Sequence, residues 1–172
     1  MESTPRFEVE KVGRLTFVHL HPGALAIGHR PPLRSLGRMR EAGVTHIVTV
    51  LSQQEDPHSI AAATRSAGLE WIWIELGSTK NLPARAKPEI KTALCSLASI
   101  LRGGGRIYLH CSAGIHRTGM IAAALLFCLG HDDAQVGELL TALRAVTAEG
   151  MGAERLDWAR SFARAQPDGD AA

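Results

Sequence analysis

Apolar segments and amphipathic segments alternate along most of the chain, and this pattern predicts alternating strands and helices. The predicted strands are the apolar runs LTFVHL (15–20), ALAIG (24–28), THIVTVL (45–51), LEWIWIEL (69–76) and RIYLH (106–110). Helices are expected where apolar residues recur every three or four positions, over 33–43, 57–68, 87–104, 117–129, 132–146 and 153–165. The alternation predicts an α/β fold with a mainly parallel central sheet, flanked by helices on both faces.

A sheet of this kind also predicts where a ligand would bind. Open parallel sheets bind ligands at the carboxyl ends of their strands. The loops after Leu51, Leu76 and His110 are therefore expected to meet at one edge of the sheet.

Length and composition fit one folded domain. The chain has 172 residues, of which 45% are hydrophobic and 21% charged, so a substantial core can form. We expect a flexible N-terminus over 1–13, the folded domain over 14–166 and a disordered tail over 167–172. The longest apolar run, 120–129, is too short to span a membrane and predicts a buried helix.

Charge and cysteine usage narrow the class of protein. Lys and Arg number 19 against 17 Asp and Glu, a balance that does not indicate a nucleic-acid binder. The three cysteines, Cys95, Cys111 and Cys128, have no paired spacing. No disulfide framework is expected, and together with the absence of an apolar N-terminal run this predicts a cytoplasmic location.

The segment HCSAGIHRTG (110–119) carries the strongest chemical signal. It follows a predicted strand and opens a predicted helix, so successive backbone N–H groups and the helix dipole would form a cradle for an anion. Gly114 allows the loop to bend, and Arg117 can grip two phosphate oxygens at once. Such surroundings favour the thiolate form of Cys111, which would then attack a bound phosphoryl group.

The segment resembles the HC-x5-R-T signature of cysteine-dependent protein tyrosine phosphatases, and the short chain resembles their dual-specificity branch. The element order from about residue 15 to 165 agrees with that family. The resemblance implies that Cys111 is the nucleophile, that Arg117 binds phosphate and that Thr118 assists turnover. It further implies a phosphate cradle of Ser112, Ala113, Gly114, Ile115, His116 and Arg117, supported by His110 and Gly119.

Other interpretations of the same segment remain. It could be a buried cysteine beside a glycine turn, with Arg117 in an ordinary ion pair. A rhodanese-like or arsenate-reductase-like protein would also place Cys and Arg around an anion loop. The Arg-Thr-Gly ending and the late position in the chain favour the phosphatase.

The chain departs from the family at the general acid. Members carry an Asp on a loop some thirty residues before the cysteine, but the corresponding segment GSTKNLPARAKPE (77–89) contains none. Glu75 is one candidate acid, because it ends a strand in step with Trp71 and Trp73, whose apolar setting would raise its pKa, although it also fits a solvated or salt-bridged strand end. Asp56 is another, although it equally fits the N-cap of the helix that starts at Pro57.

A third possibility is that the substrate needs no acid. A phosphoanhydride, as in an RNA 5′-triphosphate or an inositol pyrophosphate, releases a group that leaves without protonation. The x-H-R-T-G ending at His116 resembles phosphatases for inositol pyrophosphates, although their further basic loop residues are absent here. Lys80, Arg85 and Lys87 would either attract an acidic substrate or form a solvated face.

The sequence therefore predicts a monomeric phosphatase for phosphotyrosine, or phosphoserine and phosphothreonine, on protein or on small phosphorylated compounds. The alternatives are an anhydride phosphatase and a catalytically weak phosphate-binding module. No organic cofactor or metal, no nucleic acid and no membrane partner is expected.

Overall fold

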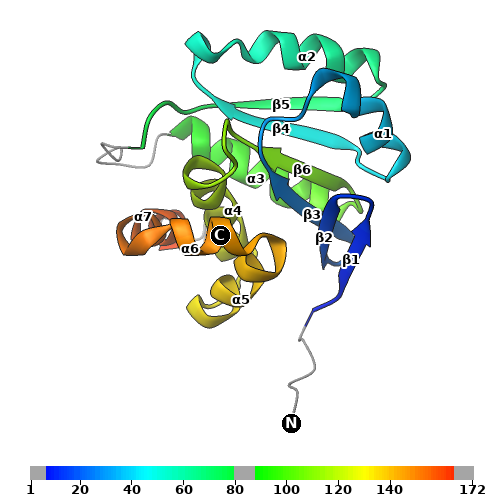
Figure 1. Ribbon diagram of the computed structural model, residues 1–172. Coiled ribbons are helices and arrows are strands. Elements are labelled where there is room, and N and C mark those ends of the chain that lie inside the picture. The colour runs from blue at the N-terminus through cyan, green and yellow to red at the C-terminus, as the bar shows by residue number, and fades with distance from the viewer. Residues whose placement is uncertain (1–6, 80–87, 165–172) are drawn as a thin grey trace, which may run out of the picture.

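The computed structural model describes residues 7–79 and 88–164 and is built around a six-stranded mixed sheet (Figure 1). Its strands are β1 (Val9–Val12), β2 (Leu15–Leu20), β3 (Gly23–Gly28), β4 (His46–Leu51), β5 (Glu70–Glu75) and β6 (Arg106–His110), in the spatial order β1-β2-β3-β6-β4-β5. β3, β6, β4 and β5 are parallel, whereas β1 and β3 both pair antiparallel with β2. The predicted α/β fold with a mainly parallel sheet is confirmed.

In the described part of the chain, seven α-helices and two short 3-10 helices accompany these strands. They are η1 (Leu33–Ser35), α1 (Leu36–Glu41), η2 (Gln53–Glu55), α2 (Pro57–Ser66), α3 (Pro88–Arg102), α4 (His116–Cys128), α5 (Asp133–Leu143), α6 (Ala145–Gly150) and α7 (Gly152–Arg164). Helices α4 to α7 follow the last strand, β6. The predicted helix 132–146 is thus divided: Arg144 is extended, with φ −168° and ψ 106°, between α5 and α6. The break depends on contacts between Arg144 and a distant loop, which are described below. The apolar periodicity of Val136, Leu139, Leu140 and Leu143 therefore does not predict it.

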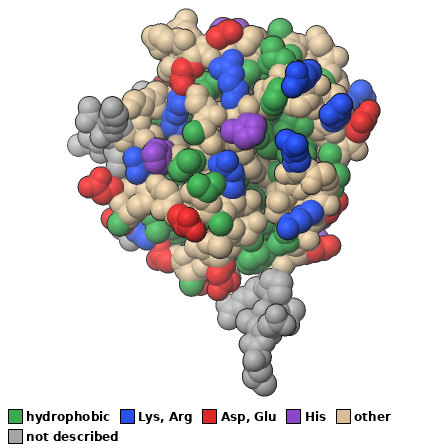
Figure 2. Space-filling model, in the orientation of Figure 1, with side chains coloured by type: hydrophobic (Ala, Val, Ile, Leu, Met, Phe, Trp, Pro, Cys, Tyr) green, Lys and Arg blue, Asp and Glu red, His purple; other side chains and the backbone are tan. Residues whose placement is uncertain are grey.

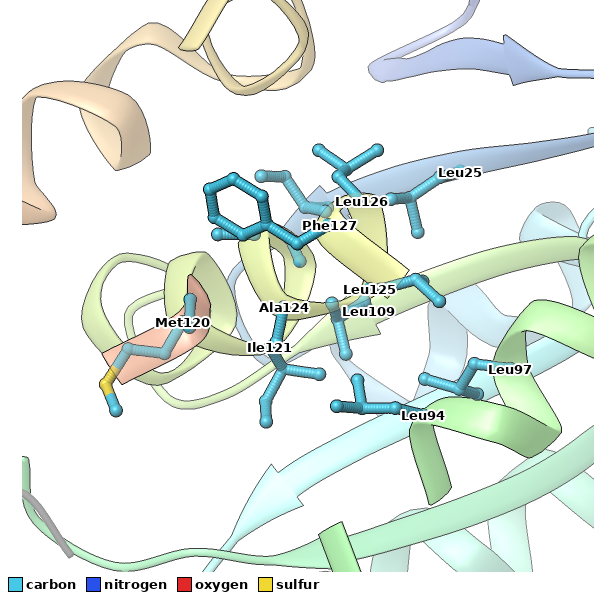
Figure 3. Packing of buried hydrophobic residues seen from close by; sticks show 14 of the residues in the cluster. Leu25, Leu94, Leu97, Leu109, Met120, Ile121, Ala124, Leu125, Leu126 and Phe127 are labelled. Carbon is cyan, nitrogen blue, oxygen red and sulfur yellow. The ribbon is translucent and has the colours of Figure 1, made fainter. Parts of the chain in front are cut away.

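The sheet separates two hydrophobic clusters. α1 and α2 cover one face, where Leu36, Met39 and Ile60 pack with strand residues, while α3 to α7 cover the other (Figure 1). α4 is buried at every position from 118 to 127, because it is enclosed by its neighbours on all sides (Figure 3). The run over 120–129 is therefore a core helix as predicted. None of the helices that the structure describes is long and apolar enough to cross a membrane.

The first strand corrects one expectation about the N-terminus. Residues 9–12, which we expected to be flexible, form β1 and pair with β2. The carboxylate of Glu10 lies 3.0 Å from the guanidinium of Arg106 and 3.0 Å from His19. These long-range contacts hold the strand in place. A short polar segment does not predict such contacts from its own sequence.

Candidate active site

The segment 110–117 leaves β6 and curls into a loop that ends at the first turn of α4 (Figure 1). Gly114 has φ +72°, and a Cβ atom there would lie 2.3 Å from backbone atoms of Gly28. Only glycine fits both the backbone angle and the space. The close approach to β3 explains why the signature has a glycine at this position.

Cys111 lies at the bottom of this loop and its side chain is almost completely buried, with 3% of the residue exposed. Its Sγ accepts a hydrogen bond from the backbone N–H of Gly114, 3.2 Å away. A backbone donor aimed at the sulfur stabilises the thiolate, the form that acts as a nucleophile. The structure thus places the predicted nucleophile where an anion bound by the loop amides would meet it.

Arg117 is held by a residue that the sequence did not single out, Glu55. Its Nη1 and Nη2 donate to Glu55 Oε2 and Oε1 at 2.6 and 2.9 Å, and Nη1 also donates to the carbonyl of Leu76 at 3.1 Å. An arginine has five N–H donors, so these contacts leave Nε and one hydrogen of Nη2, which share one edge of the guanidinium. That edge is the fork that fits two phosphate oxygens.

Glu55 is in turn fixed in its ionised form. The Arg117 hydrogen bonds, followed by weaker contributions from Ser52, lower the pKa of Glu55 to about 2. The same pair raises the pKa of Arg117. Ser112 Oγ also donates to Glu55 Oε1 at 3.2 Å, so one carboxylate connects η2 with both ends of the phosphate loop. Glu55 therefore orients the phosphate-binding group and is not a proton donor near neutral pH.

His110 connects the loop to the sheet through hydrogen bonds on both sides of its ring. Its Nδ1 lies 2.9 Å from the Cys111 carbonyl, an acceptor, so Nδ1 carries the proton. Nε2 then accepts from the hydroxyl of Thr49 at 2.9 Å, and the Thr49 oxygen accepts from the indole N–H of Trp71 at 3.0 Å. Burial lowers the pKa of His110 to about 4, so the ring is neutral.

The outer side of the loop is supported by the junction between α5 and α6. Arg144 Nη1 donates to the carbonyl oxygens of Ala113 and Gly114 at 3.2 and 2.9 Å, and Thr147 Oγ1 donates to Gly114 O at 2.6 Å. These bonds hold the carbonyls of Ala113 and Gly114 on the outer side of the loop, while the N–H of Gly114 points inward to the sulfur of Cys111. They also explain the extended backbone of Arg144, which no local sequence signal could predict.

Thr118 and Gly119 begin the buried part of α4. The hydroxyl of Thr118 is completely buried and has no hydrogen-bond partner among the described residues. A buried hydroxyl normally finds an acceptor, so the predicted assistance of Thr118 at the cysteine sulfur remains a prediction. A Cβ atom on Gly119 would lie 2.3 Å from Met151 Sδ, so this glycine permits close packing of the helix.

Neither candidate acid is brought to the cysteine. Glu75 is exposed at the end of β5. Asp56 is exposed and caps α2, with its carboxylate 3.3 Å from the N–H of Ser59. The cap explains its place before Pro57. Lys80, Arg85 and Lys87 lie outside the described residues.

A cavity of about 410 Å³ opens above the loop. Its described lining consists of Ser52, Glu55, Ser78, Thr79, Cys111, Ser112, Ala113, Ile115, His116 and Arg117. The loops after β4, β5 and β6 therefore meet at one edge, as the predicted sheet required. Glu55 is the one carboxylate in this lining. A larger cavity of about 640 Å³, next to His21 and His131, contains no residue of the loop.

Basic groups dominate the surroundings of the cavity. Arg30 donates to the carbonyls of Glu55 and Asp56, and Arg155 donates to Thr79 Oγ1 and the Met151 carbonyl. Arg30, Arg144 and Arg155 donate these hydrogen bonds to neutral oxygens, so the partners do not neutralise the positive charge of the three side chains. Figure 2 shows Lys and Arg spread over the central part of this face, with acidic side chains mostly towards its margins. The face favours anionic ligands.

Comparison with known proteins agrees with this geometry. Residues 15–166 match the family model described as PTP-SAK, Swiss Army Knife protein, DSP-PTPase phosphatase domain. Dual specificity protein phosphatase 12 of Mus musculus is 26% identical over 147 residues, which cover 82% of this chain. The alignment spans only 39% of the mouse protein.

Solved structures share the fold at low sequence identity. Kinase associated phosphatase (KAP), with its catalytic cysteine replaced by serine, has a TM-score of 0.70 at 14% identity, covering 92% of this chain and 100% of that chain. PTPMT1 in complex with PI(5)P has a TM-score of 0.66 at 15% identity, covering 86% of this chain and 94% of that chain. TpbA of P. aeruginosa in complex with phosphotyrosine has a TM-score of 0.58 at 18% identity, covering 95% of this chain and 99% of that chain.

Proposed function

The chain belongs to the DSP-PTPase phosphatase domain family, and from this premise we propose that it hydrolyses phosphoester groups through a phospho-cysteine intermediate. The proposed substrates are phosphotyrosine, and also phosphoserine and phosphothreonine, on protein. The observation that carries the proposal is the alignment of Cys111 Sγ, the loop amides and the free edge of Arg117 around one small cavity. The bound ligands of TpbA and PTPMT1, both phosphorylated, support a phosphorylated substrate.

The geometry supports a two-step reaction. In the first step the Cys111 thiolate attacks phosphorus, the bond to the leaving oxygen breaks, and the phosphoryl group is attached to sulfur. The inward N–H groups and Arg117 stabilise the three non-bridging oxygens, on which charge builds in the transition state. In the second step water attacks phosphorus, the sulfur–phosphorus bond breaks, and inorganic phosphate leaves.

A second candidate function is hydrolysis of phosphoanhydrides or small phosphorylated compounds. The observation in its favour is that Glu55, the carboxylate that lines the cavity, is held ionised by Arg117. A phosphate leaving group departs without a proton, so an RNA 5′-triphosphate or inositol pyrophosphate would not need an acid. The basic surroundings suit such highly charged substrates as well.

One kinetic series separates these functions. Rates are measured on phosphotyrosine, on aryl phosphates with increasingly acidic leaving groups and on inorganic pyrophosphate, for the wild type and Cys111→Ser. An ester phosphatase has a rate nearly independent of the leaving group, whereas an anhydride phosphatase shows a steep dependence and prefers pyrophosphate. Rapid acid quenching of a reaction with ³²P-labelled substrate should trap label on the wild type and none on the variant. If no substrate is turned over and Cys111→Ser changes nothing, the chain is a phosphate-binding module and the enzymatic proposal is wrong.

A further inference from the structure

The cavity contains four described side chains that ionise, and three of them already have other roles. Cys111 is the proposed nucleophile, and Arg117 stays charged at all relevant pH values. Glu55 gives both carboxylate oxygens to Arg117. The fourth is His116, the first residue of α4.

We propose that His116 is the proton donor for the leaving group, a role that rests on the proposed phosphoester hydrolysis. Histidine is the side chain that ordinarily exchanges protons between pH 5 and 8, so it can serve as an acid and then as a base within one cycle. It would replace the aspartate that the segment 77–89 lacks.

The position of His116 suits this task. It lines the same cavity as Cys111 and directly precedes Arg117, whose free edge binds the phosphoryl oxygens. Its side chain is exposed, so the ring can exchange its proton with solvent between turnovers. A Cβ atom built on Gly150 would lie 4.0 Å from Nε2 of His116, which places this edge of the ring next to α6.

The charged groups around the ring of His116 include both positive and negative side chains. Arg117, Glu55 and Cys111 line the same cavity as the ring, and a bound phosphate would add negative charge there. On α6, Glu149 is exposed beside Gly150. A bound phosphate dianion attracts a positively charged ring, so substrate binding and the proposed donor role are electrostatically compatible.

The proton balance follows directly. As the phosphorus–oxygen bond breaks, the imidazolium of His116 gives one proton to the leaving oxygen and becomes neutral. In the second step the neutral ring accepts a proton from the attacking water while the sulfur–phosphorus bond breaks. The ring is then protonated again, and Cys111 is again a thiolate.

The test compares His116→Gln with the matched control His29→Gln. His29 is also exposed, and it does not line the cavity. Each protein is assayed on phosphotyrosine, whose phenolic leaving group has a pKa of about 10, and on 2,4-dinitrophenyl phosphate, whose leaving group needs no proton. We expect His116→Gln to lose about 100-fold or more in kcat/KM on phosphotyrosine and less than about 5-fold in kcat/KM on the dinitrophenyl ester, because kcat/KM reports the first step and not the hydrolysis of the phospho-cysteine that both esters share. Retained activity on that ester also shows that the variant is folded.

The pH profile supplies a second readout. For the wild type on phosphotyrosine, kcat/KM should fall at high pH as the ring loses its proton, and His116→Gln should lose this descending limb. His29→Gln should keep both the rate and the limb. Equal losses on the two esters, or an unchanged descending limb in His116→Gln, would overturn the assignment.

The failure of the underlying function is a separate result. If Cys111→Ser abolishes turnover while His116→Gln behaves as the wild type on phosphotyrosine, the phosphatase stands and only the role of His116 is wrong. If the wild type is active only on anhydrides, both the ester function and the acid role are wrong. The three variants together therefore assign each outcome to one proposal.

Discussion

At the scale of single residues, Glu55 decides how Arg117 is presented to a phosphate. The carboxylate occupies the Nη1–Nη2 edge of the guanidinium, so the adjacent edge, formed by Nε and Nη2, is held in a fixed orientation on the side of Cys111. The neighbouring Asp56 has the same charge and a different task, since it caps α2 in a left-handed conformation with φ +53°. Of these two adjacent acids, Glu55 therefore belongs to the candidate site and Asp56 has a structural role.

We expect Glu55→Gln to lower kcat/KM on phosphotyrosine by about 10- to 100-fold, because misplacing a positioning contact by about 1 Å has effects of this size. The amide cannot accept from both Arg117 nitrogens, so Arg117 loses its fixed orientation. The inhibition constant of inorganic phosphate should rise in parallel. A general loss of stability would lower the amount of active protein without changing this constant.

The matched control is Asp56→Asn. Asn is as good an N-cap as Asp and tolerates the left-handed conformation, so activity and stability should stay close to the wild type. Similar losses in the two variants would contradict the assigned difference between them. The control also tests Asp56 as a general acid, and Glu75→Gln does the same for the other candidate.

At the scale of elements, the phosphate loop depends on supports from three directions. β3 approaches it at Gly28, η2 supplies Glu55, and the break between α5 and α6 supplies Arg144 and Thr147. The loop sequence alone therefore does not define its shape.

Gly114→Ala tests how closely β3 constrains the loop. The added methyl group would lie 2.3 Å from the backbone of Gly28, at a φ of +72° that alanine rarely adopts. Gly28 is paired with His110 in the sheet and the carbonyl of Gly114 is held by Arg144 and Thr147, so neither backbone is free to move, and we expect a stability loss of about 2 kcal/mol or more and loss of activity. Chemical unfolding and the phosphotyrosine assay measure both effects.

Gly137→Ala is the corresponding control on α5. A methyl group there meets nothing within 4 Å, so the variant should gain about 0.5–1 kcal/mol from helix propensity with unchanged activity. If Gly114→Ala were equally harmless, the described contact with Gly28 would not be present in solution.

At the scale of the whole molecule, His110 links the stability of the fold to pH. The ring is buried in the centre of the sheet, and its pKa is lowered from an ordinary value of 6.5 to about 4. Between these values the unfolded chain binds a proton that the folded protein does not. Stability should therefore fall as the pH falls through this window, by up to about 3 kcal/mol for complete loss.

Urea unfolding at several pH values between 4 and 7.5 measures this contribution. We expect His110→Asn to be less stable than the wild type at pH 7.5, because it loses the bond to Thr49, and to show a flatter pH dependence below pH 6.5. Parallel pH curves for the two proteins would show that His110 does not titrate in this way.

Much of this molecule follows from local patterns. The five predicted strands and the cradle around Cys111 and Arg117 depend on periodicity and on residues close in sequence. Glu55, Arg144 and Thr147 reach the loop only through the tertiary fold, so no local pattern indicates them. The loop after Leu51 lies at the expected edge, but nothing in its local sequence distinguishes Glu55 from the adjacent Asp56 as the residue that contacts Arg117.

The burial of the cysteine sulfur has a practical consequence for labelling reagents. The sulfur is reached through a small cavity that Arg117 also lines, so a bulky electrophile is hindered and a small anion is attracted more strongly than a neutral compound of the same size. Iodoacetate should therefore alkylate Cys111 faster than the neutral iodoacetamide, and the exposed Cys95 should show no such preference. A chemical probe for this protein is best built around a compact anion that carries its reactive carbon where phosphorus would lie.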